Sequence, residues 1–217
     1  TASIRDRFRG VNSNVVVINN FPFIEELKNG MTSPGQEKAI CYVGAISRHR
    51  GAMEIVRALK KTRDVHLYLA GAISDSSLRE QMEAEPGWAK VYEMGFIPRR
   101  TVAEVLAKSL AGLVIFHPEP NHLSAMPVKM FEYLSAGRPI ICSNFDTWEK
   151  MLGPYNCALF VDPFNPKEIT DAINWVADHP EEALEMGKRG QEMVEKQLNW
   201  NCEELKLIDL YKKLSLS

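Results

Sequence analysis

The chain has 217 residues, of which 45% are hydrophobic and 25% are charged, and its formal net charge is −2 at pH 7. This length and composition suffice to bury the core of one large globular domain. The near-zero net charge argues against a general role on nucleic acids or membrane surfaces. No apolar run reaches the length that spans a membrane, and no secretory leader is visible.

Short apolar segments alternate along the chain with segments of helical pattern. The expected strands are residues 39–43, 65–70, 90–94, 111–116, 139–142 and 158–161. The expected helices are residues 52–61, 76–84, 101–110, 128–136 and 166–178, one that starts at residue 180, and 201–214. Strands that alternate with single helices predict an α/β fold with a doubly wound parallel sheet.

Two of the expected helices begin with a capping pattern. Thr101 is followed three residues later by Glu104, which predicts a capping box. Asn165, Pro166 and Glu168 combine an N-cap, a proline in the first helical turn and a capping glutamate. We therefore expect helices to start at these two places.

The four cysteines lie far apart in the sequence: Cys41, Cys142, Cys157 and Cys202. Three of them fall in expected strands or beside one. This distribution indicates buried, reduced thiols rather than a disulfide framework. It predicts a cytoplasmic protein.

In a doubly wound sheet, ligands bind at the carboxyl ends of the strands, near the point where the strand order reverses. The most informative segment is the helix expected over residues 128–136, where Lys129 and Glu132 lie one turn apart and share a face. The helix N-terminus adds free backbone N–H groups and a partial positive charge. This combination suits a phosphorylated ribose. The alternative is an ordinary surface Lys–Glu pair, which contributes little.

The loop after the first strand carries Arg48 and Arg50 between Gly44 and Gly51. Glycine lets a backbone approach a phosphate closely, and arginine offers a planar fork that matches phosphate oxygens. The alternative is a basic loop that only contacts water. Neither a Gly-x-Gly-x-x-Gly fingerprint nor a P-loop is present, which argues against a dinucleotide dehydrogenase and a P-loop NTPase.

Two further loops follow strands. Phe96 and Ile97 lie in the loop after the third strand, and either a base-binding or a core-packing role fits them. The loop after the fourth strand is long and proline-rich, which is typical of functional loops. It contains His117 and His122, but no third ligand lies at a recognisable spacing, so we predict no metal site.

The segment from Lys129 to Pro139 resembles the nucleotide-sugar-binding signature of GT-B glycosyltransferases, a glutamate followed by a small-residue helix and Gly-x-Pro-hydrophobic. The loops at residues 44–51 and 95–98 resemble the corresponding donor loops. Residues 15–22 resemble the connector from an N-terminal domain, and residues 199–204 resemble the start of the closing helix. The resemblance covers about residues 15–214 and is to glycosyltransferase family 4 and its near relatives.

This resemblance implies the Rossmann-like, donor-binding C-terminal half of a two-domain GT-B enzyme of polysaccharide biosynthesis. It would transfer a sugar from a nucleoside-diphosphate sugar, with retention, and without a metal or cofactor. Residues 1–36 would be the connector and linker, and residues 37–217 the nucleotide-sugar-binding domain. The implied site residues are Arg50, Lys129 and Arg48 for the donor diphosphate, Glu132 for the ribose, Phe96 and Ile97 for the base, and Gly44 and Ser124 in the donor loops.

The sequence departs from the family pattern at Ser124, where a glutamate is common, and at Ala45, where an arginine is common. Two alternatives therefore stay open. One is a related nucleotide-sugar epimerase, and the other is a non-enzymatic module that has lost the donor site. None of the implied site residues is a nucleophile or general base, so acceptor activation would come from the missing N-terminal domain, and this chain alone would be inactive.

Overall fold

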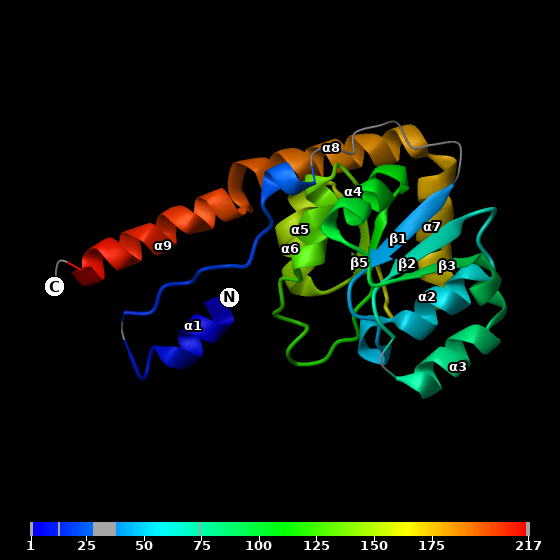
Figure 1. The fold of residues 1–217 in the computed structure, drawn as a ribbon, viewed down its shortest axis with the longest axis horizontal. Helices are drawn as coiled ribbons and strands as arrows, with labels where there is room; N and C mark the ends of the chain where they lie inside the picture. The colour runs from blue at the N-terminus through cyan, green and yellow to red at the C-terminus, as the bar shows by residue number, and fades with distance from the viewer. Residues whose placement is uncertain (1, 13, 28–37, 74, 216–217) are drawn as a thin grey trace.

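The structure, a computed structural model, describes residues 2–12, 14–27, 38–73 and 75–215. Its body is a six-stranded sheet whose paired strands run parallel, in the order β3-β2-β1-β4-β5-β6 (Figure 1). The strands are β1 (Ala39–Val43), β2 (His66–Ala70), β3 (Val91–Gly95), β4 (Gly112–Val114), β5 (Ile140–Ser143) and β6 (Ala158–Val161). The predicted doubly wound α/β fold is therefore confirmed.

Helices cover both faces of the sheet. The helices of the described residues are α1 (Ala2–Phe8), α2 (Ala52–Leu59), α3 (Ser76–Ala84), α4 (Arg99–Lys108), α5 (Val128–Ser135), α6 (Asp146–Leu152), α7 (Pro166–Asp178), α8 (Pro180–Gln197) and α9 (Trp200–Ser215), of which α1 and α9 lie away from the sheet. Short 3₁₀ turns are η1 (Ile24–Glu26), η3 (Arg48–Arg50), η4 (Pro86–Lys90) and η5 (Gly153–Tyr155).

Alternate residues of each strand point to opposite faces of the sheet, and this divides the core in two. Ile40 and Tyr42 of β1 face α2, α3 and α7. Cys41 of the same strand faces the cluster that includes α4, α5, α6 and the end of α8. Burial of each large aliphatic side chain contributes about 1.5–3 kcal/mol, so the two clusters hold the layers together.

The bounds predicted from the sequence agree with the observed bounds of most elements to within one or two residues. The predicted cap at Asn165 is confirmed, because its side chain accepts hydrogen bonds from the N–H groups of Lys167 and Glu168. The prediction of a capping box at Thr101 is wrong. Helix α4 begins at Arg99, because the carbonyl of Pro98 already accepts the first helical bond, from Val102.

Three further differences concern short elements. Helix α6 was not predicted, since it has seven residues and no side-chain cap. Strand β4 ends at Val114 rather than at Phe116, because the chain leaves the sheet there. Helix α1 lies in the segment that was expected to be a connector.

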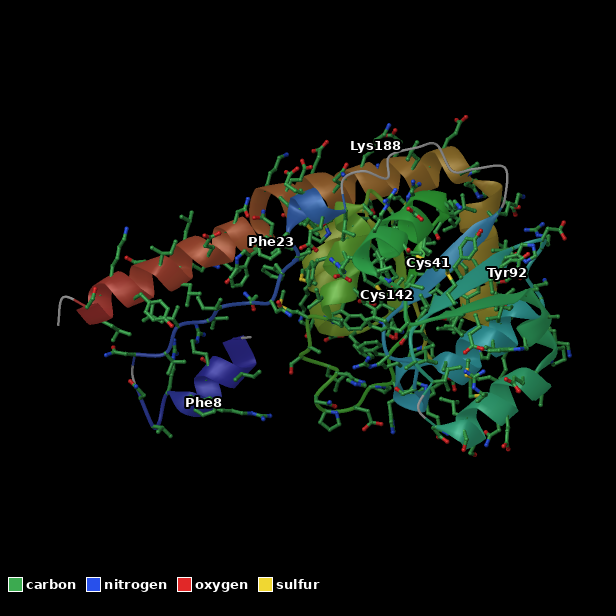
Figure 2. The ribbon with its side chains drawn as sticks, in the orientation of Figure 1. Phe8, Phe23, Cys41, Tyr92, Cys142 and Lys188 are labelled. Atoms are coloured by element: carbon green, nitrogen blue, oxygen red, sulfur yellow. The ribbon has the colours of Figure 1, made fainter. Side chains whose placement is uncertain are left out.

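Of the four cysteines, Cys41, Cys142 and Cys157 are buried and Cys202 is partly buried, and all four are free thiols. Figure 2 shows Cys41 and Cys142 within the body.

The N-terminal segment and α9 are joined to each other. Glu203 accepts hydrogen bonds from the backbone N–H and the side-chain amide of Asn19, at 2.9 and 3.2 Å, and Trp200 donates its backbone N–H to Pro22. Beyond this junction α9 extends away from the body, with α1 on the same side (Figure 1).

The part of the expected linker at residues 28–36 lies outside the described residues. No described helix is long and apolar enough to cross a membrane.

Tyr133 fixes α5 against the end of β1. The two strands β1 and β4 share only the Cys41–Gly112 register, so Val43 lies beyond their ladder. The N–H of Val43 donates instead to the hydroxyl oxygen of Tyr133, at 2.8 Å. The ring of Tyr133 packs on Gly112, where a Cβ atom would come within 2.1 Å of it. This contact sets the position of the α5 side chains relative to the loop after β1.

We therefore expect Tyr133→Phe to lower the free energy of unfolding by about 1–2 kcal/mol, because the substitution leaves the Val43 N–H without its partner. Denaturant unfolding at a fixed pH measures the change. Tyr92→Phe is the matched control, since Tyr92 is 51% exposed. An equal loss in the two variants would show that the Val43 hydrogen bond does not stabilise the fold.

Candidate functional site

A cavity of about 620 Å³ opens at the carboxyl ends of β1 and β4, the two strands between which the strand order reverses. The loops after β1, β2, β3 and β4 and the N-terminus of α5 form its walls. This is the position at which doubly wound sheets bind ligands. A second hollow, of about 800 Å³, lies beside the amino end of β6, and its charged residues are mostly acidic, which does not suit a phosphate. We therefore take the first cavity as the candidate site.

Lys129 lies in the first turn of α5 and is only 9% exposed. Its Nζ atom has no hydrogen-bond partner among the described residues and lies 3.7 Å from the centre of the Tyr42 ring. Gly44, with φ of +119°, lies on its other side, and a Cβ atom there would come within 3.2 Å of Nζ. Burial, together with repulsion from Arg50, lowers the pKa of Lys129 from 10.5 to about 7, against the opposite effect of Glu132.

Arg50 reaches the same cavity from the turn η3. Its guanidinium lies 5.5 Å from the centre of the Phe116 ring and donates to the carbonyl of Ala45 at 3.3 Å. The turn ends at Gly51, whose φ is +69° and where a Cβ atom would come within 2.2 Å of the Ile115 carbonyl oxygen. Glycine is therefore required at the position that turns the chain into α2.

Glu132 is largely buried on the same face of α5 as Lys129, with 14% of its side chain exposed. Its Oε1 atom accepts a hydrogen bond from Nη1 of Arg99 at 2.7 Å. Arg99 also donates to Glu26 of the N-terminal segment, at 2.8 Å. Arg99 thus holds the Glu132 carboxylate in place and links it to the N-terminal segment, which lies 73 residues before Arg99 in the sequence.

The structure brings most of the predicted site residues together. Arg50, Lys129, Glu132, Phe96, Ile97 and Gly44 all line the cavity. Arg48 does not: its guanidinium points away and donates to Gln81 at 2.9 Å. Ser124 does not line the cavity either, although its neighbours His122 and Ala125 do.

Arg99 is the residue that sequence reasoning missed. It follows the loop after β3 by one residue, so its position at the carboxyl end of a strand was an available signal. No signal in the sequence indicated that Arg99 pairs with Glu132, because the two residues lie in different elements and far apart in the chain.

Two close His–Glu contacts lie between the long loop after β4 and neighbouring elements, one to the turn η3 and one to the first turn of α2. His49 Nδ1 lies 3.0 Å from Glu119 Oε1, and His117 Nε2 lies 3.1 Å from Glu54 Oε2. The backbone N–H of His117 also donates to the carbonyl of His49, at 2.9 Å. Within the described residues, no group of three or more His, Cys, Asp or Glu side chains is arranged to hold a metal ion.

The cavity therefore presents three basic side chains, from Arg50, Lys129 and Arg99, against one carboxylate. The N-terminus of α5 adds backbone N–H groups without a side-chain cap. Such a site favours an anion of high charge that also carries hydroxyl groups. Phe96, which is 92% exposed, and Ile97 add an apolar wall at the mouth.

A sequence model of the family "Glycosyl transferases group 1" matches residues 23–193. The chain belongs to this family. It is 23% identical over 163 residues to the MMP alpha-(1->4)-mannosyltransferase of Mycolicibacterium hassiacum, a match that covers 74% of this chain and 38% of that protein. The chain spans less than half the length of the curated relatives it matches.

Solved structures show the same fold. The Anabaena protein Alr3699/HepE, in complex with UDP and glucose, matches with a TM-score of 0.80 and 12% identity, over 98% of this chain and 62% of that chain. The C-terminal domain of a glycosyl transferase group 1 family protein (LpcC) from Francisella tularensis matches with a TM-score of 0.69 and 15% identity, over 82% of this chain and 98% of that one. This group 1 chain therefore has the Rossmann-like half of a GT-B fold.

Proposed function

We propose that the chain is the donor-binding half of a glycosyltransferase, which moves a sugar from a nucleoside-diphosphate sugar to an acceptor with retention of configuration. The observation that carries this proposal is the meeting of Arg50, Lys129 and Glu132 at the N-terminus of α5, in a cavity at the switch point of the sheet. Family membership supports the reaction class.

In the proposed complex, the diphosphate lies between Arg50, Lys129 and the α5 N-terminus. When the bond to the sugar breaks, negative charge grows on the leaving phosphate. Fixed cations and helix N–H groups stabilise that charge where it develops, with no reorganisation at the moment of reaction. Glu132 accepts hydrogen bonds from the ribose hydroxyls, and the base lies against Phe96 and Ile97.

The remaining expected residues take lesser roles in this proposal. Gly44 lets the backbone after β1 approach the phosphates closely, since it carries no side chain. Arg48 acts only as a long-range positive charge, because it faces Gln81 and Asp75 instead of the cavity.

We also propose that residues 37–217 form the donor domain and that residues 1–36 lead to it from an acceptor-binding domain. Exposed apolar side chains on α1 and α9, including Phe8, Leu205 and Tyr211, fit contacts with such a domain. The acceptor pocket would lie in that second domain.

The first prediction concerns the ribose contact. Glu132→Gln keeps the shape of the side chain and removes its charge. Hydrogen bonds to a charged group contribute about 1.5–3 kcal/mol, so the affinity for UDP or GDP should fall about tenfold or more. Isothermal calorimetry on the folded variant measures this loss.

Glu104→Gln is the matched control, because Glu104 is exposed on α4, lies 3.4 Å from Arg100 and does not line the cavity. If Glu132→Gln binds as tightly as the control, Glu132 does not hold the ribose. If the unchanged chain binds neither UDP nor GDP, the reading of the chain as a module without a donor site is favoured.

The second prediction concerns the diphosphate. Replacing Arg50 and Lys129 together with alanine should weaken binding of UDP far more than binding of uridine, since each loss removes a cation from the phosphates. Added salt should mimic part of the effect, because partly exposed charges are screened over about 8–10 Å. Arg48→Ala is the matched control and should have a small effect. Equal losses for nucleoside and diphosphate would assign Arg50 and Lys129 to the fold instead.

The third prediction is that this chain alone transfers no sugar, because the acceptor site and the closed cleft that excludes water need a second domain. The measurement is transfer from labelled UDP-glucose or GDP-mannose to a mixture of sugar acceptors. Sustained transfer by residues 1–217 alone would contradict the proposed division of labour.

A further inference from the structure

We propose that the buried amine of Lys129 is only partly protonated in the ligand-free protein at neutral pH, and that it takes up a proton from solvent when the donor diphosphate binds. Donor capture would then be coupled to proton uptake, and release of the nucleoside diphosphate would return the proton. This inference rests on the proposed function and adds to it a pH dependence located at one nitrogen atom.

The position of the Lys129 amine carries the inference. Its Nζ atom is buried at the wall of the cavity and has no hydrogen-bond partner among the described residues. In place of hydrogen-bond partners, it faces two aromatic rings. Nζ lies 3.7 Å from the centre of the Tyr42 ring and 5.9 Å from the centre of the Phe116 ring. Aromatic faces attract an ammonium ion much less than the water that it loses on burial, so the neutral amine is favoured here.

The charged groups around Lys129 reinforce this preference. From η3, Arg50 repels a second positive charge in the same cavity. On its own helix, Glu132 attracts the ammonium, but one oxygen of that carboxylate is already held by Arg99.

The other titratable neighbours supply no negative charge near neutral pH. From β1 come the Cys41 thiol, whose pKa is raised by burial to about 12, and the Tyr42 hydroxyl, whose pKa burial also raises. From the loop after β4, the ring of His122 lines the cavity, with its Nδ1 atom 3.0 Å from the His117 carbonyl. The resulting pKa of Lys129, about 7, places its protonation within the physiological range.

A bound diphosphate reverses this balance. It brings at least two negative charges to the cavity wall, and an opposite charge within about 4–6 Å favours the charged form of an amine. The pKa of Lys129 therefore rises on binding. Because the free amine titrates near 7, the proton-linked part of the affinity is fully present below that pH and is lost as the pH rises above it.

The test is calorimetric titration of the chain with UDP-glucose, in buffers that differ in ionisation enthalpy. UDP-glucose is a diester, so it lacks the terminal phosphate of UDP that itself titrates near pH 6. We expect uptake of about one proton per ligand at pH 8 and about none at pH 5.5, and an affinity about tenfold or more weaker at pH 8.5 than at pH 6.5. UDP and GDP are titrated in parallel to establish binding.

Three variants locate the proton. Lys129→Arg carries a fixed charge and should bind without proton uptake, and Lys129→Met should bind more weakly, also without uptake. Lys90→Met is the matched control, because the Lys90 amine is partly buried elsewhere and donates to Thr62. That variant should take up the same proton as the unchanged chain.

Each contrary result has a distinct meaning. Binding at pH 8 with no proton uptake would overturn the linkage and leave the proposed function intact. Equal uptake by the Lys129→Met variant would assign the proton to another group and overturn the proposal. Absence of binding by UDP-glucose, UDP and GDP alike would overturn both the linkage and the proposed function. An NMR titration of the Lys129 side chain in the free chain gives an independent check, since a midpoint near the usual 10.5 would also overturn it.

Discussion

The separation of β1 from β4 is the constraint on which the site depends. Past the Cys41–Gly112 register, the two strands no longer form a ladder, because the chain winds outward in opposite directions from this pair. The backbone that is released there needs other partners, and the Tyr133 hydroxyl supplies one of them to Val43. The same hydrogen bond places α5 at the mouth of the gap, so one contact both completes the fold and positions Lys129 and Glu132.

The gap also determines the electrostatics of the cavity. Lys129 points into a space between aromatic rings, and Arg50 closes the same space from η3. Burial beside Arg50 disfavours the charged form of the Lys129 amine in the ligand-free protein, and a highly charged anion would reverse that preference. The fold therefore places Arg50 and the protonatable amine of Lys129 where a diphosphate would bind.

Arg99 and Glu203 connect this cavity to the parts of the chain that leave the body. Arg99 bridges Glu132 and Glu26, and Glu203 holds Asn19 beside the start of α9. The N-terminal segment is thus linked to the Glu132 carboxylate through Arg99, and it contacts directly the helix that extends away from the domain.

The sequence by itself determined the strands and all helices except α1 and α6, because apolar periodicity and helix caps such as Asn165 are local properties of the chain. It also determined the cluster on α5, since Lys129 and Glu132 are neighbours on any helix. Only the tertiary structure decided that Arg48 faces Gln81 while Arg50 faces the cavity, that Arg99 holds Glu132, and that Lys129 is desolvated. These three facts depend on which distant segments come into contact and on how much water they exclude, and neither quantity is a property of a short stretch of sequence.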